Sequence, residues 1–586
     1  MIVLVWDQLS NVENWVKQRY IVLAKEFGNR PFRLEDAEES LKKAGIETGN
    51  VKELLSVLRR NGLLEVEKDP EDFRRSIYRL FIEKTVSPTR DKLFRSLKAG
   101  ADLIRGGVDY KVLLLFLFYK ALSDKWNALV DKFIAEGRTK TQAYLLSNRK
   151  YYVLYDENEQ NLLTWHEITK IRETLAELAN ALTRISRLNE KLADLEKLVE
   201  ILGFKGFVSE DNLHTIESII QIFNSLDFSK ISYDVVGDAY MWILNYFAPQ
   251  KAKEGENYTP LEIVKLVVDL LDIEIDEENG IVTVLDPALG SGSMLIVSRD
   301  YVREKYGDEG EEVLMLYGQE RNEIMGAIAK MNLILHDIKN YEIFIGDSLA
   351  NPRFEKCDYV VANPPWNQDY NMNGLIQDPK VKRIYTQFTS TLPPKNSMDW
   401  GWIQLMLYFA KKKVGIILDN GALFRGGSEK RVREAIVKRD LVEAVVLLPE
   451  KLFYNTGAPG IVMIFNRNKP EERKGKILFI NASQEYEKHP EVRRLNRLGE
   501  KNIKKIVESC QKFEDIEGFA RVVTLEEIAK NDYNLNITLY VVPIEEGEKI
   551  DIREEYAELK GIEKERDEIK AKFENYVSGV IRALGG

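Results

Sequence analysis

The spacing of apolar and polar positions differs between parts of the chain. From Glu262 onward, short apolar runs alternate with helical segments. Near-continuous apolar strands separated by helices are typical of a mainly parallel sheet that is covered on both faces. We therefore expect an α/β domain in this part of the chain. The expected strands are Thr283–Asp286, Leu314–Gln319, Ile343–Ile345, Tyr359–Ala362, Val414–Leu418, Ala444–Leu448 and Ile461–Phe465.

The stretch from Arg90 to about Phe247 has a helical pattern instead. Between Ile168 and Leu202 apolar residues recur in steps of three and four, which line up on one face of a helix. This pattern predicts a single long amphipathic helix that packs in a bundle. The residues of the apolar face are Ile171, Leu175, Leu178, Leu182, Ile185, Leu188, Leu192, Leu195 and Leu198.

The two ends of the chain have patterns of their own. Residues 12–80 read as two helices, which end at Gly45 and near Gly62, followed by a strand and a return strand in "FRRSIYRLF". Helix, helix and hairpin in this order resemble a winged helix, a fold that binds either DNA or protein. Residues 546–586 form a charged helix with an apolar stripe, which favours an interface with another chain over packing on its own bundle. The stripe consists of Ile552, Tyr556, Leu559, Ile562, Ile569, Phe573, Tyr576 and Val580.

These patterns predict four parts. They are a winged-helix-like extension (1–85), an α-helical domain (86–247), a catalytic α/β domain (248–545) and a C-terminal helix for partner docking (546–586).

Charge and composition narrow the choice of function. The 586 residues carry a net charge of −10, whereas a protein that holds duplex DNA alone is usually basic. Either the chain binds no nucleic acid, or a partner supplies most of the affinity for it. Two cysteines and four histidines disfavour a disulfide framework and a metal site, and they suit a cytoplasmic protein. We expect no membrane-spanning segment, and no Walker-type ATP-binding motif is present.

Candidate chemistry lies where the expected strands end. "VTVLDPALGSGSML" (282–295) follows a strand with Asp286 and a turn containing Gly290 and Gly292, which would let a ligand approach the backbone at a helix N-terminus. Glu320 directly follows the next strand, where a carboxylate can accept both ribose hydroxyls of a nucleoside. Asp347 ends the third and can accept from an adenine amino group. Upstream, "NYTP" (257–260) can close the other side of the pocket. The alternative is that the Gly-rich segment is only a tight turn and that the acids are surface carboxylates.

The fourth strand ends at "NPPW", residues 363–366. Two consecutive prolines stop the strand and make a stiff, extended tip. This order of motifs closely resembles that of the S-adenosylmethionine-dependent amino-methyltransferases. In that family the Asn363 oxygen and the Pro364 carbonyl would hold both N–H groups of an amino group, Pro365 would leave no competing N–H, and Trp366 would stack on a flipped base.

Longer stretches narrow the resemblance to the methylation subunit of type I restriction-modification systems. They are residues 317–338, 391–407, 420–465 and 531–541, and the similarity covers roughly residues 90–545. It implies N6-adenine methylation of DNA, a specificity subunit that docks against two methylation subunits, and a separate ATP-driven restriction subunit. It implies a Rossmann-like fold with S-adenosylmethionine as cofactor and no metal. The cofactor-binding residues so implied are Tyr258, Thr259, Pro260, Asp286, Pro287, Gly290, Ser291, Gly292, Glu320, Asp347 and Asn363, and the catalytic ones are Asn363, Pro364, Pro365 and Trp366.

The sequence departs from the family pattern at three positions. Leu289 and Ser293 replace the usual Cys and second Gly of the Gly-rich turn, and Trp366 replaces Phe or Tyr. Methylation of an RNA base or of a protein glutamine is the alternative activity. N4-cytosine methylation and a non-catalytic scaffold are weaker alternatives. We also expect the loop 368–394 to close over the flipped base, with Phe388 as a candidate contact.

Overall fold

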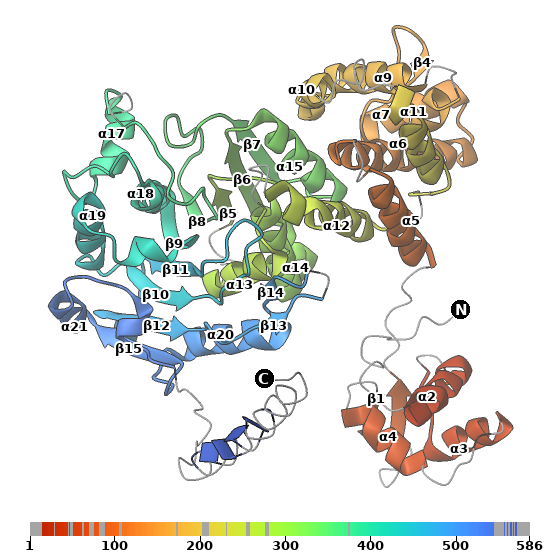
Figure 1. The fold of residues 1–586 in the computed structure, drawn as a ribbon. Coiled ribbons are helices and arrows are strands. Elements are labelled where there is room, and N and C mark those ends of the chain that lie inside the picture. The colour runs from red at the N-terminus through yellow and green to blue at the C-terminus, as the bar shows by residue number, and fades with distance from the viewer. Residues whose placement is uncertain are drawn as a thin grey trace, which may run out of the picture. The chain divides into compact units, whose positions relative to one another are not determined.

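A computed structural model shows how these patterns fold (Figure 1). It describes residues 14–543, except 28–29, 45, 47–50, 61–63, 69–75, 81–87, 105–107, 171–173, 202–209, 230, 253–257, 276–279, 373–375 and 491. Beyond these it describes residues 556, 559–560, 563–564, 566–567, 569–570 and 573. The chain divides into two compact units. The first consists of Met1–Val268, Ile273–Ala362 and Phe453–Thr456, and the second of Asp269–Asp272, Asn363–Leu452 and Gly457–Gly586.

The N-terminal segment has the elements of a winged helix. Helices α2 (Asn14–Phe27), α3 (Leu34–Lys43) and α4 (Val51–Arg60) precede an antiparallel hairpin of β1 (Leu64–Lys68) and β2 (Ser76–Leu80). Phe32 adds a short bridge to Tyr78 of β2, through N–H···O bonds of 2.9 and 2.8 Å. The two expected helices and the hairpin are present, with α2 as an additional helix before them, and the winged-helix-like unit stays a prediction.

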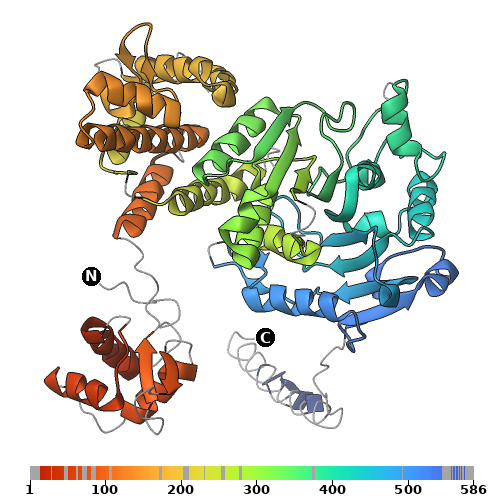
Figure 2. The ribbon, with the colours of Figure 1, turned by 180° about the vertical axis from the view of Figure 1, so that it is seen from behind.

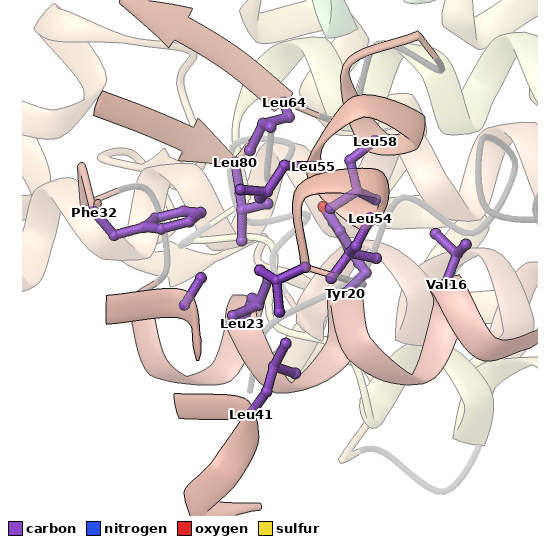
Figure 3. Packing of buried hydrophobic residues seen from close by; sticks show 12 residues of the cluster. Val16, Tyr20, Leu23, Phe32, Leu41, Leu54, Leu55, Leu58, Leu64 and Leu80 are labelled. Carbon is purple, nitrogen blue, oxygen red and sulfur yellow. The ribbon is translucent and has the colours of Figure 1, made fainter. Parts of the chain in front are cut away.

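This segment has an apolar core of its own (Figure 3). Side chains from all three helices meet those of the hairpin, and Phe32 stacks on Phe27 with ring centroids 4.6 Å apart. Burial of a Leu side chain contributes about 1.5–3 kcal/mol, so this core is the main source of stability for the segment. The buried residues are Val16, Tyr20, Leu23, Phe32, Ala37, Leu41, Val51, Leu54, Leu55, Leu58, Leu64 and Leu80.

A helical region follows. Its helices are α5 (Pro88–Ile104), α6 (Lys111–Ala135), α7 (Lys140–Lys150), α8 (Trp165–Ile168), α9 (Thr174–Leu188), α10 (Leu195–Ile201), α11 (Glu210–Asn224) and α12 (Tyr233–Lys251), with a hairpin of β3 (Tyr155–Asp156) and β4 (Asn161–Leu162). The apolar helix α6 holds a fully buried Lys120, which pairs with Asp124 and donates to the Leu226 carbonyl at 2.8 Å. Within the described ranges, no helix is both long enough and apolar enough to cross a membrane.

The prediction of one continuous helix over 168–202 is wrong. Helix α9 ends at Leu188, Asn189 is extended (φ −131°, ψ 106°), and α10 begins at Leu195. The Asn189 side chain accepts the Val153 N–H at 2.8 Å and donates to the Ile185 carbonyl at 2.8 Å. Asparagine competes with the backbone for hydrogen bonds in this way and thereby ends helices. Leu178, Leu182, Ile185, Leu192, Leu195 and Leu198 are nevertheless buried, as the period predicted.

The first unit also contains a parallel sheet with strand order β8-β5-β6-β7. The strands are β5 (Val282–Asp286), β6 (Leu314–Glu320), β7 (Tyr341–Ile345) and β8 (Cys357–Ala362). Helices α14 (Ser293–Glu312) and α15 (Glu323–Leu335) connect them, and α13 (Leu261–Leu271) precedes β5. Because all four strands are parallel, their carboxyl ends lie at one edge of the sheet. The candidate residues that follow β5, β6 and β7 are therefore brought to that edge.

The second unit has strand order β15-β12-β10-β11-β9. Strand β11 (Gly460–Asn466) is antiparallel to both β9 (Ala410–Asp419) and β10 (Val442–Leu447), β12 (Lys476–Asn481) is parallel to β10, and β15 (Ala520–Thr524) is antiparallel to β12. The helices are α17 (Pro379–Thr386), α18 (Asp399–Phe409), α19 (Gly427–Val437), α20 (Glu500–Lys512) and α21 (Leu525–Lys530). Figures 1 and 2 both show α20 beside β12. The predicted α/β class with a mainly parallel sheet is confirmed.

The predicted C-terminal helix lies largely outside the described residues. Tyr556, Leu559, Ile569 and Phe573 of its apolar stripe are described, and all four are exposed. The predicted four-part division and the docking role of this helix stay predictions.

Candidate active site

The Gly-rich loop after β5 is built by two glycines in the left-handed region. Gly290 has φ +53° and Gly292, which caps α14, has φ +82°, conformations that side chains other than glycine rarely adopt. A side chain at Gly290 would meet open space, whereas one at Gly292 would touch Ala329 at 3.4 Å. The loop is thus packed on α15 at Gly292 and open at Gly290.

Glu320, at the end of β6, holds this loop through hydrogen bonds. One carboxylate oxygen accepts the Gly290 N–H and the other accepts the Asn322 N–H, both at 2.8 Å. Burial raises the pKa of Glu320, and the two N–H donors act against that rise. A carboxylate has about four lone-pair sites, so acceptor capacity is left for a ligand.

Asp286 is buried and faces its own loop. Its carboxyl group accepts the Ala288 N–H at 3.0 Å, and burial raises its pKa to about 8. The carbonyl of Pro287, the next residue, accepts a hydrogen bond from the Ser348 hydroxyl at 2.6 Å. This bond connects the loop after β5 to the loop after β7. Ser291 contacts Ser293, one of the two departures in the loop, with their hydroxyl oxygens 2.9 Å apart.

Asp347 shapes the loop after β7. Its side chain accepts the Leu349 N–H at 2.9 Å, and the Arg321 guanidinium lies 3.8 Å from its other oxygen. The Tyr258 hydroxyl contacts that of Tyr110, at the start of α6, and donates to the Met325 sulfur at 3.8 Å. Thr259 follows, and the Pro260 carbonyl accepts the Ile263 N–H at 3.0 Å at the start of α13. Their roles toward a cofactor stay predictions.

The NPPW tip belongs to the second unit and leaves the sheet directly after β8, which is paired with β5. Pro364 is buried, Pro365 is exposed, and Asn363 and Trp366 are half-buried. The indole N–H of Trp366 donates to the side-chain oxygen of Asn363 at 3.0 Å. The amide oxygen of the candidate substrate-binding residue is therefore oriented by the aromatic residue of the same motif.

The loop 368–394 contains helix α17, capped by Asp378, whose side chain accepts the Lys380 N–H at 2.7 Å. The Arg439 guanidinium lies 5.4 Å from the centre of the Phe388 ring. A contact between Phe388 and a flipped base stays a prediction.

Sequence reasoning missed three buried residues that organise the site. Gln319 accepts the Arg353 N–H at 2.9 Å and donates to the Asn351 carbonyl, which fixes the loop after Asp347. Asn332 of α15 donates to the Ser291 carbonyl at 2.9 Å, below the Gly-rich loop. Asp399 accepts the N–H of the residue after the NPPW tip. Of these three residues, only Gln319 could have been noticed in the sequence, because it is a polar amide within an apolar strand. In the structure this amide is fully buried.

In the part of the chain that the structure describes, no group of three His, Cys, Asp or Glu residues is placed to hold a metal ion. Cys357 and Cys510 are both free thiols and buried.

Comparisons with known proteins identify the family of the chain. The family model of the N-6 DNA methylases matches residues 231–549. The type I restriction enzyme MjaVII methylase subunit of Methanocaldococcus jannaschii is 60% identical over 582 residues, which are 98% of this chain and 99% of that protein. The MjaVIII methylase subunit of the same organism is 48% identical over 99% of both chains.

A solved structure shows the same fold. The methyltransferase subunit of a type I restriction-modification system from Streptococcus thermophilus superposes with a TM-score of 0.65 at 28% identity, over 77% of this chain and 100% of that one. The fold and the matched family define the class of α/β amino-methyltransferases. The chain belongs to the N-6 DNA methylase family, and within it to the methylase subunits of type I restriction enzymes.

Proposed function

We propose that this chain transfers a methyl group from S-adenosylmethionine to the N6 amino group of a flipped adenine in DNA, as the modification subunit of a type I complex. The observation that carries the proposal is the NPPW tip, with its Asn363 amide oxygen held by Trp366, in a chain of the N-6 DNA methylase family. Adenine must leave the helix because its amino group is inaccessible within the duplex.

The residues after β5 and β6 fit a nucleoside cofactor. The open backbone at Gly290, the N-terminus of α14 and the remaining lone pairs of Glu320 supply space, N–H groups and an acceptor for ribose hydroxyls. Asp347 supplies a further acceptor for the adenine moiety. When bound, S-adenosylmethionine supplies an electrophilic methyl group on a positively charged sulfur.

The tip prepares the nucleophile. The amino nitrogen of adenine is weakly nucleophilic because its lone pair is delocalised into the ring. The Asn363 side-chain oxygen and the Pro364 carbonyl can accept both N–H groups, which favours a tetrahedral nitrogen with a directed lone pair. These two acceptors would hold the nitrogen toward the methyl group that a bound S-adenosylmethionine would supply. Positioning of the two reactants provides most of the acceleration.

A partner is required to find the site on DNA. The net charge of −10 argues against tight DNA binding by this chain alone, and Tyr556, Leu559, Ile569 and Phe573 expose an apolar surface for another subunit. We propose that a specificity subunit reads the sequence and docks two copies of this chain, and that a restriction subunit completes the complex. DNA as the substrate suits the predicted cytoplasmic location.

The proposal is tested by methyl transfer from labelled S-adenosylmethionine to DNA, with this chain alone and with its candidate specificity subunit. We expect N6-methyladenine only when the partner is present, and an Asn363→Ala variant should be inactive. Transfer by the chain alone would assign DNA reading to this chain, with residues 1–85 as the first suspect. N4-methylcytosine as product, or transfer only to RNA or to a protein glutamine, would overturn the proposal.

A further inference from the structure

The residue that follows the NPPW tip turns the chain. Asn367 has φ +52°, in the left-handed region, which asparagine adopts more readily than most residues other than glycine. Its N–H donates to a carboxylate oxygen of Asp399 at 2.9 Å. This bond holds the chain where it turns away from Trp366.

Asp399 is itself rigidly held. It is the first residue of α18 and is fully buried. Its second oxygen pairs with Arg425, which also binds Asp419 at 2.9 Å and Glu429 at 2.8 Å. The Ser397 hydroxyl donates to Glu429 at 2.8 Å. A buried carboxylate with both oxygens engaged by N–H donors has one orientation only.

A role limited to helix α18 does not account for this arrangement. An acidic residue in the first turn favours a helix from an exposed position and needs no arginine partner. Asp399 instead reaches from α18 to the backbone one residue beyond Trp366, and Trp366 in turn orients the Asn363 amide. Gln368, the residue after Asn367, is held as well, since the Trp402 indole N–H donates to its side-chain oxygen at 3.3 Å.

We propose that Asp399, locked by Arg425, is a positioning residue for methyl transfer: it fixes the turn after NPPW and thereby the geometry of Trp366 and Asn363. This inference rests on the proposed function. It assigns to the 391–407 segment a task in the reaction that is distinct from binding the cofactor.

The test compares two isosteric substitutions around the same arginine. Asp399→Asn removes one of two acceptors and cannot satisfy both Asn367 and Arg425, because an amide has a single acceptor oxygen. Asp419→Asn alters a contact to Arg425 but none to the tip, and it serves as the matched control. Both are assayed with the specificity partner at saturating S-adenosylmethionine and DNA.

We expect Asp399→Asn to lower kcat by about 10- to 100-fold, the size of loss that misplaced reacting groups produce, with unchanged binding of S-adenosylmethionine. Asp419→Asn should stay within about twofold of the wild type, as expected for a change away from the tip. An Asp399→Asn variant with wild-type kcat, or an equal loss in Asp419→Asn, would overturn the proposal.

Hydrogen exchange gives a readout that does not depend on activity. Measured by mass spectrometry on peptides that cover residues 363–372, exchange should be faster in Asp399→Asn than in Asp419→Asn or the wild type. Equal exchange in all three refutes the proposed lock. An inactive wild type that nevertheless shows this difference would contradict the proposed function and leave the positional role of Asp399 standing.

Discussion

The indole N–H of Trp366 is hydrogen-bonded to the side-chain oxygen of Asn363, at 3.0 Å. This oxygen is the proposed acceptor for the adenine amino group. A carbonyl oxygen has two lone pairs, so it can accept from the indole and from the base together. The bond also keeps the oxygen, rather than the amide nitrogen, turned toward Trp366. Neither a Phe nor a Tyr side chain carries an N–H group, so this way of orienting Asn363 depends on the tryptophan at position 366.

Trp366→Phe keeps an aromatic face and removes the N–H group. We expect kcat to fall by about fivefold, the equivalent of one ordinary hydrogen bond, with little change in the KM for DNA. Steady-state methyl transfer with the specificity partner measures both. Trp366→Ala, which also removes the stacking face, should raise the KM as well. Equal kinetics for wild type and Trp366→Phe would show that the bond has no role in catalysis.

Glu320→Gln tests the cofactor loop. Glu320 accepts the N–H groups of Gly290 and Asn322 with separate oxygens, and glutamine offers only one acceptor oxygen. Loss of a charge-assisted hydrogen bond of about 1.5–3 kcal/mol should weaken S-adenosylmethionine binding by about 10- to 100-fold in calorimetric titration. Glu323→Gln, an exposed change at the start of α15, is the control and should bind normally. Comparable losses in both variants would contradict a specific role for Glu320.

Asp286 links the site to pH. Burial raises its pKa to about 8 from an ordinary value of 3.8, so the folded chain retains a proton there that the unfolded chain releases. The stabilising contribution is therefore present at low pH and is lost as the pH rises from about 4 to 8. Asp286→Asn keeps an acceptor for the Ala288 N–H and removes this titration.

We expect the free energy of unfolding of the wild type, relative to that of Asp286→Asn, to fall by a few kcal/mol between pH 5 and pH 8, at about 1.4 kcal/mol for each pH unit. Urea titrations of both proteins across this range measure the difference. Ionisable groups that do not interact with Asp286 are common to both proteins and cancel, and Glu320, whose charge adds to the rise in the pKa of Asp286, is the exception. Parallel pH profiles would rule out a buried, proton-binding Asp286.

Three strand ends of the sheet were predictable because the apolar run stops at, or directly before, a polar residue with a recognisable task. Asp286 and Glu320 end β5 and β6 in the structure, and Ala362 ends β8 directly before Asn363. The prolines at 364 and 365 admit no further pairing, so the position of the tip follows from local chemistry alone. The helices and the hairpin of the N-terminal segment were also predictable from local sequence, because the spacing of apolar residues within each element indicates its type.

The features that the sequence did not predict depend on contacts between residues far apart in the chain. The Asn189 break depends on Val153, which is 36 residues away, and no periodicity in the helix pattern reports such a bond. The contact between Asn367 and Asp399 spans 32 residues, and the one between Asp399 and Arg425 spans 26. Charged residues near one another in a sequence usually lie on a solvated face, so their burial together is visible only once the chain is folded.

Arg433 of α19 provides the last prediction. It is almost fully buried, and it donates to the Tyr533 carbonyl at 2.8 Å and to the carbonyls of Ala422 and Arg425 at 3.3 and 2.9 Å. Burial lowers its pKa to about 10, so it remains charged at neutral pH. It thus fastens the 531–536 segment, part of the stretch that resembles the type I family, to the helix that carries Glu429.

Arg433→Met fills a similar volume and removes the donor to the Tyr533 and Arg425 carbonyls, whereas the Ala422 carbonyl keeps the Trp400 indole N–H at 2.8 Å. We expect a loss of about 2–4 kcal/mol in the free energy of unfolding, because buried acceptors left without partners are costly. Proteolytic cleavage within 531–536 should become faster. Arg431→Met, an exposed change two residues away on α19, should cost no more than about 0.5 kcal/mol. Equal stability of the two variants would mean that the segment is held by its other contacts, such as the bond from the Leu535 N–H to the Leu423 carbonyl at 3.0 Å.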